Sequence, residues 1–255
     1  MKYEELTAFQ LNDLCKMNRV ILLTFGSIEQ HSSHLPVGTD YICMLKRVEE
    51  IAERTNNIVF APIQIGYSFN HIGMTGTISL DAKIFIDVVR NILEQLFEQG
   101  WRRVLIFSGH NGNWASLEVA TQITRERFPN SQIIFSRGYP KSKNQTRFIK
   151  NFDYHAGTVE TALVSYFSKI DLDNLPTPNE NLPKSIVSLL DKDELDDIDR
   201  LLISGLTPGH TNLLSKNGIW GRDDPSNYDQ IPVDVAMKQY IDFFVELLQR
   251  WDKIA

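Results

Sequence analysis

Residues with metal-binding side chains follow the first apolar run of this chain. Glu29 and His31 come just after residues 20–25 (VILLTF), and Asp40 follows in the same polar segment. Side chains two residues apart in an extended segment point to the same side, so Glu29 and His31 can face one space. Carboxylates and imidazoles are suitable ligands for Zn²⁺, Mn²⁺ or Fe²⁺, and a carboxylate such as that of Asp40 can bridge two ions. The pattern predicts a site for one or two divalent ions.

A structural role is the alternative for this segment. Asp40 could cap the helix that follows, and the histidines could form hydrogen bonds within the loop. For any single residue this alternative is competitive. Because the candidates all fall within residues 26–40, directly after a buried strand, we favour the metal site.

A second polar segment, SGHNGN, follows the apolar run 104–107 (VLIF). Its glycines permit a tight turn and a close approach of the backbone to a ligand. His110 is predicted as a further metal ligand, and its neighbour Asn111 as a substrate contact. Asn113 is predicted to cap the next helix, and a hydrogen-bonded turn histidine is the structural alternative for His110.

The segment DYHAGTVET places His155 before a predicted helix and Glu160 in its first turns. Glu160 stands among apolar neighbours and is therefore predicted to face inward. A buried carboxylate needs a partner, and a metal ion or a histidine can provide one. The alternative is a helix cap in which Thr158 and Glu160 satisfy the first turn.

A stretch rich in glycine, serine and threonine, residues 66–79, follows the run IVFAP and suits a loop that faces a substrate. Ser68 and His71 are predicted to contact that substrate, although structural roles fit them at least as well. Four of the six histidines of the chain follow a predicted strand or open a helix, which is unusual for surface histidines.

The composition is that of an ordinary globular protein. The chain has 255 residues, 42% of them hydrophobic, and a net charge of −6, which suits one large α/β domain. No nucleic-acid binding is expected, because binders usually carry a basic excess, and the basic stretch 141–150 is interpreted as a solvated loop. Cys15 and Cys43 form no CxxC pair, and no apolar run reaches the length of a membrane span. We therefore expect a cytoplasmic protein without membrane contact.

Apolar runs alternate with amphipathic segments along the chain. Strands are predicted at 20–25, 58–62, 104–107 and 132–136, and helices at 41–54, 81–99, 114–128, 157–167 and 233–251. Asp81 is predicted to cap the helix at 81–99, and Gly100 to end it. The alternation predicts an α/β fold, a three-layer α/β/α sandwich with a mostly parallel central sheet. Ligands of such sheets bind beyond the carboxyl ends of the strands, where the polar segments lie.

Residues 1–255 are predicted to form a single domain. One segment departs from the alternation: residues 170–200 are rich in Pro, Asn and acidic residues. It is predicted to be a surface insertion, with a partner-binding flap or a mobile lid as the alternatives.

The polar segments, taken in order, resemble the motifs of the creatininase (creatinine amidohydrolase) family. The family pattern reads GSxEQHGPHLPxxTD, then a GxSxxHxxFPGT loop, then GHGGN or a close variant, then HAGxxET. The corresponding segments here are GSIEQHSSHLPVGTD, GYSFNHIGMTGTISL, SGHNGN and DYHAGTVET. The match spans residues 19–166, and residues 215–225 resemble the GxxGDP turn of the family. Ser32 and Ser33 replace the usual Gly-Pro of the first motif.

The resemblance implies a three-layer fold with two divalent metal ions per chain (Zn, Mn or Fe). It also implies a metal-dependent amidohydrolase that cleaves a C–N bond of a small, often cyclic, amide through a metal-activated water. Glu29, Asp40 and His110 match the ligands of one ion, and His31 and Asp40 match ligands of the second, with Asp40 bridging. Homo-oligomers, hexamers built from dimers, are the assembly that the resemblance implies.

Two further residues match active-site positions of the family. His155 matches a histidine that contacts the substrate and can donate a proton, and Glu160 matches a carboxylate that is either a metal ligand or the base that orients the water. Creatininase proper has a glutamate ligand at the position of Gly112 and a tryptophan in the region of Asn151 and Phe152. These departures argue against creatinine as the substrate.

Three other functions remain compatible with the sequence. A deformylase or a peptidase of the same family would share the site but not the substrate. A non-catalytic metal-binding member would keep the fold, as would a structural subunit without turnover. The complete ligand set argues against the last two, because a degenerate site is expected to lose at least one ligand.

Overall fold

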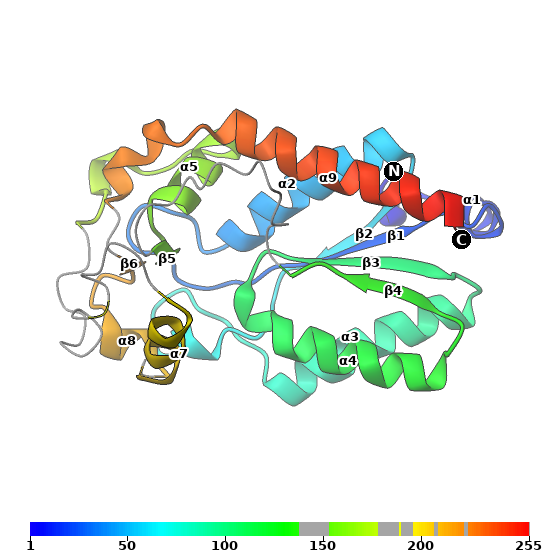
Figure 1. Cartoon of the computed structure of the whole chain (residues 1–255), viewed down its shortest axis with the longest axis horizontal. Coiled ribbons are helices and arrows are strands. Elements are labelled where there is room, and N and C mark those ends of the chain that lie inside the picture. The colour runs from blue at the N-terminus through cyan, green and yellow to red at the C-terminus, as the bar shows by residue number, and fades with distance from the viewer. Residues whose placement is uncertain (138–152, 178–188, 190–195, 207–208, 222–223, 255) are drawn as a thin grey trace.

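The computed structural model of the chain describes residues 1–137, 153–177, 189, 196–206, 209–221 and 224–254 (Figure 1). The central sheet is formed by β1 (Ile21–Phe25), β2 (Ile58–Ile63), β3 (Arg103–Ser108) and β4 (Gln132–Phe135). The helices that flank it are α2 (Thr39–Thr55), α3 (Ala82–Glu98), α4 (Trp114–Arg127), α5 (Thr158–Phe167) and α9 (Val233–Ile254). Each strand and helix predicted from the sequence is present, with its ends shifted by a few residues at most.

The sheet lies between two helical layers (Figure 1). Its strands are all parallel, in the order β2-β1-β3-β4. Helices α2, α5 and α9 share one hydrophobic core with one face of the sheet, and α3 and α4 share a second core with the other face. The predicted three-layer α/β/α sandwich with a parallel sheet is therefore confirmed.

Strand β1 is buried on both faces. Each of its five residues is fully buried. Leu22 belongs to the core of α9, which contains Phe244, whereas Leu23 and Phe25 belong to the core of α3, which contains Phe85. Burying a Leu or Phe side chain stabilises a fold by roughly 1.5–3 kcal/mol. The loop after β1 therefore starts from a strand that is held from both sides.

Some elements were not predicted from the sequence. They are α1 (Ala8–Lys16), α7 (Asp197–Leu206), α8 (Thr211–Leu214), β5 (Asp153–His155), β6 (Trp220–Gly221) and short 3₁₀ helices at Tyr3–Glu5, Phe69–His71, Asn111–Asn113, Leu172–Asn174 and Pro225–Gln230. Strands β5 and β6 pair antiparallel, and elements of two or three residues are too short to carry a periodic pattern. Helix α1 did carry a signal, since Thr7 and Gln10 form a capping box.

Several predicted segments lie wholly or partly outside the described residues. They are the basic stretch 141–150, residues Asn151 and Phe152, and most of the predicted insertion at 170–200. The described start of that insertion is tied to the rest of the chain, because Asp171 N donates to His34 O over 3.1 Å. Its described end is the beginning of α7.

Of the predicted helix caps, Asp81 is confirmed and Asn113 is not formed, and the cap that was the alternative role of Asp40 is absent. Asp81 caps α3 by accepting a hydrogen bond from Lys83 N over 2.8 Å, and Gly100, with φ +101°, follows the end of that helix. Asp40 does not cap α2, whose N-cap is Gly38, and lies instead in its first turn. Asn113 precedes α4 but its side chain makes no capping hydrogen bond. The side chains of Asp40 and Asn113 instead make hydrogen bonds beyond the carboxyl ends of the strands, with Ser27 and Gly26 respectively.

The connections that follow β1 and β3 cross to opposite faces of the sheet. Helix α2, which follows β1, lies on one face, and α4, which follows β3, lies on the other (Figure 1). In open α/β sheets such a switch point opens a crevice beyond the carboxyl ends of the strands. The polar segments after β1 and β3 meet at this place. Within the described residues, no helix is both long and apolar enough to cross a bilayer.

Candidate metal centre

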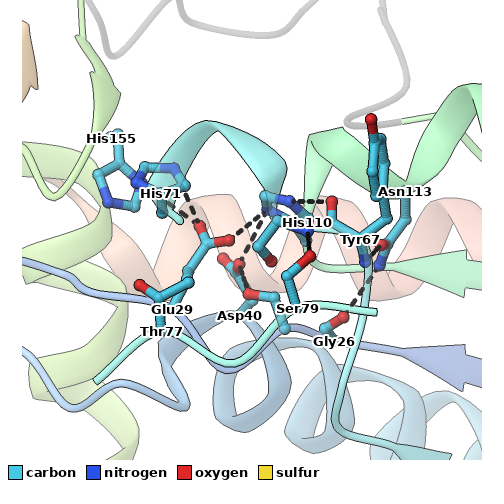
Figure 2. A network of polar contacts seen from close by, with 12 residues as sticks. Gly26, Glu29, Asp40, Tyr67, His71, Thr77, Ser79, His110, Asn113 and His155 are labelled. Carbon is cyan, nitrogen blue, oxygen red and sulfur yellow. Dashed lines mark hydrogen bonds and ion pairs between the residues drawn. The ribbon is translucent and has the colours of Figure 1, made fainter. Parts of the chain in front are cut away.

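The predicted ligands of the first two motifs come together at the switch point. Glu29, His31, Asp40 and His110 are all buried, and each is exposed by less than a tenth of its surface. Glu29 and His31 follow β1, Asp40 comes from the first turn of α2, and His110 follows β3. In Figure 2 the carboxylates of Glu29 and Asp40 both face the same side of the His110 ring.

His110 is oriented by a backbone carbonyl. Its Nε2 lies 3.1 Å from Tyr67 O and can only donate there, because a carbonyl oxygen is an acceptor. A neutral ring then keeps its lone pair on Nδ1, which lies 3.2 Å from Glu29 Oε2 and 3.3 Å from Asp40 Oδ2. A backbone carbonyl that fixes the ring in this way is the usual support of a metal-bound histidine.

His31 is oriented in the same manner from the other ring nitrogen. Its Nδ1 lies 3.0 Å from Glu29 O and donates to it, so a neutral ring keeps its lone pair on Nε2. That nitrogen lies 3.6 Å from Asp40 Oδ1 and 3.7 Å from Glu160 Oε2. Asp40 therefore faces His110 with one oxygen and His31 with the other.

The spacing and chemistry of these atoms fit divalent ions. Ligands 2.0–2.2 Å from a tetrahedral ion lie about 3.4 Å from one another, and the distances above run from 3.2 to 3.7 Å. Glu29 Oε2 and His31 Nε2 are buried and make no hydrogen bond within the described residues. Buried polar atoms without partners cost free energy, and a bound ion removes that cost.

Other groups of potential ligands overlap with this set. Three groups have ligand atoms within 4.8 Å of one another: Glu29 with His31 and Asp40, His31 with His155 and Glu160, and Glu29 with His71 and His155. The first two contain the residues named above, and the third adds the histidine of the 66–79 loop. The geometry alone therefore leaves a choice among neighbouring positions.

The histidines and carboxylates of the cluster form ion pairs. Burial acts to lower the pKa of His31, but the nearby carboxylate of Asp40 raises it to about 10. Burial also opposes the charged form of His110, yet the charge of Glu29 raises the pKa of His110 well above its usual range. Burial acts to raise the pKa of Glu29, and the charge of His110 reverses this and lowers it to about 2. Both histidines must lose a proton before they can bind a metal ion.

Ser27 and Asn113, which the sequence did not assign to the site, hold the ligands and their loops in place. Ser27 Oγ donates to Asp40 Oδ2 over 2.5 Å. Asn113, which was predicted as a helix cap, accepts from Tyr67 N over 2.8 Å and donates to Gly26 O over 2.9 Å (Figure 2). Asn113 thus ties the loop after β2 to the loop after β1. Its position in the SGHNGN motif was the available signal.

His71 and His155 form the other side of the cluster. The two rings lie 4.2 Å apart, centroid to centroid, and Figure 2 shows both beside Glu29. Burial lowers the pKa of both, that of His155 well below its usual range, so both rings are neutral. Ser68 is also buried, and its Oγ makes no hydrogen bond within the described residues.

Not every predicted site residue reaches the centre in the same way. Asn111 is exposed, outside the network of hydrogen bonds and ion pairs described above. The Glu160 side chain is 28% exposed, so it faces the cluster without being enclosed, and its Oε2 accepts from Ala156 N over 2.6 Å. The capping and the site interpretations of Glu160 therefore both describe contacts that are present.

Two histidines lie away from the cluster. His34 is buried and its Nε2 lies 2.8 Å from Thr161 Oγ1. His210 is exposed at the start of α8. The four remaining histidines are those predicted from the motifs.

The fold and the site define an α/β protein with a metal-ligand set at the switch point of its sheet. Residues 4–247 match the creatininase family, described as creatinine amidohydrolase. The chain belongs to this family, which is one of metal-dependent hydrolases acting on carbon–nitrogen bonds.

Relatives of known activity match parts of the chain. A 3-dehydro-scyllo-inosose hydrolase of Thermotoga maritima is 29% identical over 109 residues, which cover 42% of this chain and 35% of that protein. A creatinine amidohydrolase of Pseudomonas putida is 31% identical over 101 residues, 37% of this chain and 38% of that protein. A mycofactocin precursor peptide peptidase of Mycolicibacterium smegmatis is 25% identical over 172 residues, 65% and 64% of the two chains. Each match spans less than two thirds of the relative.

Solved structures resemble nearly the whole chain. A mutant creatininase of type II superposes with a TM-score of 0.72 at 18% identity, and covers 97% of this chain and 98% of that one. A creatininase with Mn and a mutant of Zn-Zn type both have 19% identity and the same coverage, with TM-scores of 0.68 and 0.67. At this identity the likeness establishes the fold.

Proposed function

We propose that this protein is a metal-dependent amidohydrolase that cleaves a C–N bond of a small amide with a metal-activated water. One observation carries the proposal. The free nitrogens of two buried histidines, each fixed by a backbone carbonyl, face opposite oxygens of one carboxylate, Asp40. A purely structural ion pair does not need two oriented rings, whereas a pair of metal positions bridged by a carboxylate does.

The proposed centre holds two ions. Glu29, Asp40 and His110 would bind the first, and His31, Asp40 and Glu160 the second. Zn²⁺, Mn²⁺ and Fe²⁺ all suit such mixed imidazole and carboxylate ligands. The solved neighbours with Mn and of Zn-Zn type support the first two of these metals.

The assignment of Glu160 to the second ion is supported by the space around Gly112. A Cβ atom at residue 112 would lie 2.3 Å from His110 Nε2 and 2.7 Å from Tyr67 O. No side chain fits there while His110 keeps its bond to Tyr67, so residue 112 cannot supply a ligand. Glu160, 3.7 Å from His31 Nε2, is the carboxylate in position to do so.

The neutral histidines beside the ligands supply the remaining chemistry. A bound divalent ion polarises a carbonyl group and lowers the pKa of a bound water towards neutrality. His155 is placed to move a proton to the leaving nitrogen, because its ring is neutral and its Nδ1 lies 3.6 Å from Glu29 Oε1. His71 and the unpartnered hydroxyl of Ser68 are the groups placed to bind the substrate.

The substrate class is broader than creatinine. The relatives include a peptidase, so linear amides belong with the cyclic amides among the candidates. The inosose hydrolase acts on a ketone, which has no C–N bond, and its activity is not part of this proposal. Phe152 and Asn151 stand where creatininase proper has a tryptophan, which disfavours creatinine itself. We expect a cyclic or formyl amide, with a short peptide as the alternative.

Metal analysis and substrate profiling together test the proposal. Protein purified without added metal, then loaded with Zn²⁺ or Mn²⁺, should bind two ions per chain and hydrolyse at least one of creatinine, lactams, formamides and short peptides. Glu160→Gln should reduce the content to one ion and lower activity, whereas Glu98→Gln, on the exposed face of α3, should change neither. Fewer than one ion per chain, or full activity of Asp40→Ala, would overturn the proposal.

Assembly and compartment remain predictions from the resemblance and the composition. We propose a homo-oligomer, a hexamer by resemblance, in the cytoplasm. Light scattering coupled to size-exclusion chromatography measures the number of chains directly. A monomer at micromolar concentration would contradict the first of these proposals.

A further inference from the structure

Gln30 is buried between two histidines that belong to different loops. Its Nε2 lies 3.0 Å from each of His71 Nδ1, His155 Nε2 and Gly218 O. Its Oε1 accepts a hydrogen bond from Ser32 N over 3.0 Å. An amide NH₂ group has only two hydrogens, so Gln30 can donate to only two of its three neighbours.

The orientation of the Gln30 amide is fixed by the backbone. Ser32 N can only donate and Gly218 O can only accept. Rotating the amide by half a turn would place two oxygens together at Gly218 and two N–H groups together at Ser32. The oxygen and nitrogen of Gln30 therefore stand as assigned, and one of its two hydrogens belongs to Gly218 O.

The second hydrogen is decided by His155. Its Nε2 lies 2.7 Å from the backbone oxygen of Gln30, a distance at which that nitrogen must carry a hydrogen and donate it. It therefore cannot accept from the Gln30 side chain. The remaining hydrogen of Gln30 points to His71 Nδ1, which also lies 3.1 Å from Thr211 Oγ1. His71 Nδ1 is thus an acceptor, and a neutral His71 carries its hydrogen on Nε2.

We propose that Gln30 is a positioning residue that holds His71 and His155 in the same tautomer, with the hydrogen on Nε2, so that the two rings offer opposite polarity to Glu29. His71 then presents an N–H and His155 a lone pair, and both of these atoms lie 3.6 Å from the same oxygen of Glu29. The inference rests on the proposed function and deepens it, because it states the polarity that the site offers to an amide. The carbonyl oxygen of the substrate lies towards His71, and the leaving nitrogen towards His155.

The two histidines have different roles in hydrolysis. His71 Nε2–H donates to the carbonyl oxygen as negative charge develops there. His155 Nδ1 accepts the proton that the attacking water loses as the C–O bond forms, and returns it to the leaving nitrogen as the C–N bond breaks. The reaction consumes one water and yields a carboxylic acid and an amine.

Gly218 is adapted to the same amide. A Cβ atom at this position would lie 1.9 Å from Gln30 Oε1 and 2.9 Å from its Cδ, and the backbone has φ +86°. Any larger residue at 218 would push the Gln30 side chain away from the histidines. The segment 215–225, far from the other motifs in sequence, therefore contributes to the tautomers through one glycine.

The assigned tautomers also narrow the choice of metal positions. A nitrogen that carries hydrogen has no lone pair for a metal ion. The group formed by Glu29, His71 and His155 is therefore not a metal site in this arrangement, although its ligand atoms lie close together. Metal content should be unchanged in His71→Asn.

Nitrogen NMR of histidine side chains tests the proposal directly. The protein is labelled with ¹⁵N histidine, loaded with diamagnetic Zn²⁺, and its long-range ¹H–¹⁵N spectrum assigned with single His→Asn variants. Wild-type protein should show His71 protonated on Nε2 and His155 protonated on Nε2 with Nδ1 free. A wild-type His71 protonated on Nδ1 would overturn the proposal without any mutant being needed.

A matched pair of variants separates Gln30 from general packing. Gln30→Glu keeps the acceptor for Ser32 N but replaces the donor with an acceptor, so His71 should move its hydrogen to Nδ1. Thr211→Val removes the other polar contact of the same nitrogen and should leave the tautomer as in wild type. Loss of one donor to a developing oxyanion costs about 100-fold in kcat, so Gln30→Glu should show this loss with little change in KM.

The outcomes distinguish this inference from the proposed function. An unchanged His71 tautomer in folded Gln30→Glu would refute the role of Gln30, whatever the activity. Wild-type tautomers as stated, in a protein that hydrolyses no amide, would refute the hydrolase assignment instead. Circular dichroism shows whether each variant is folded, and the wild-type spectrum decides the tautomers if Gln30→Glu is not.

Discussion

The two ends of the central sheet each bury charged side chains, but they satisfy them differently. At the amino end of β3, the guanidinium of Arg103 donates to Asn18 O over 3.0 Å and to Asp252 Oδ1 over 2.7 Å, and it lies over the ring of Trp251. At the carboxyl end of β1, Glu29 Oε2 is buried near histidines without any hydrogen bond in the described structure. The chain completes the first cluster by itself and leaves the second incomplete.

The difference separates structural from functional burial of charge. Removing a charge from water is costly unless partners replace the water. Arg103 finds those partners within the chain, so its burial needs no ligand. Once His31 has lost its proton, the lone pairs of Glu29, His31 and Asp40 face one another, and a positive ion between them satisfies all three. Buried charge indicates a binding site when its free lone pairs converge.

Among the variants considered, Asp40→Asn is expected to cause the largest loss of metal affinity. It keeps the size of the side chain but removes the charge that faces both histidines. Loss of an outer partner of a ligand costs about 10- to 100-fold in metal affinity, so loss of a bridging ligand should cost at least about 1000-fold. Plasma mass spectrometry and zinc titration measure the change. Retention of two tightly bound ions would end the bridging role of Asp40.

The change of metal affinity with pH should be nearly as large as the change caused by Asp40→Asn. The pKa of His31 is raised to about 10 and that of His110 lies well above its usual range, so both are protonated at pH 7. Binding must then release about two protons, and the affinity should rise by up to about 100-fold per pH unit until His31 deprotonates near pH 10.

Calorimetry in buffers of different ionisation enthalpy counts the protons that metal binding releases.

The raised pKa of His31 should also affect the stability of the metal-free protein. Its free energy of unfolding should fall as the pH rises from about 6.5 towards 10, because the folded state holds a proton on His31 that the unfolded state has lost. Proton release that is independent of pH, or close to zero, would contradict the ion pairs.

Arg103→Met tests the amino end of the sheet, where the buried charge is expected to support stability and not metal binding. It keeps the apolar contact with Trp251 but leaves Asn18 O without its donor, which should reduce the free energy of unfolding by about 2 kcal/mol. Chemical denaturation measures this change, and metal content should remain at the wild-type value. A large loss of metal would show that the two ends of the sheet are coupled.

Ser27→Ala should have the smallest effect, and it acts beside the centre. The variant removes the hydroxyl that donates to Asp40 Oδ2 and leaves all ligands in place. We expect a loss of about 10-fold in metal affinity, with stability nearly unchanged. The control is Ser165→Ala, since Ser165 Oγ donates to the carbonyl of Ala162 within α5, away from the centre. An affinity loss as large as that of Asp40→Asn would place Ser27 among the ligands.

Local patterns were sufficient for the fold and for the ligand segments. The runs VILLTF and VLIF are strands because they are apolar on both faces, and the polar residues after them meet because parallel strands end at one edge. Asp81 begins its helix through its own side chain and Gly100 ends it through its own backbone, so both helix ends could be predicted from the sequence. Each of these signals lies within a few residues of the feature that it determines.

Contacts between segments that are distant in the sequence could not be predicted from such local patterns. Asn113 looked like a helix cap because a cap and a bridge between loops use the same amide, and only the positions of Gly26 and Tyr67 decide between them. Asn111 sits in a metal-site motif, yet the turn directs it to the surface. Ser32, with φ +61°, occupies a conformation that favours glycine, which its side-chain chemistry does not reveal.

What the sequence alone determined is therefore the set of chemical groups and the edge of the sheet where they collect. What the tertiary structure decided is the state of each group. A histidine becomes a donor or an acceptor according to the atom opposite its other nitrogen, and those atoms are Tyr67 O, Glu29 O and the two ends of Gln30. Such partners are chosen by folding, because residues far apart in the chain meet only when the layers are packed.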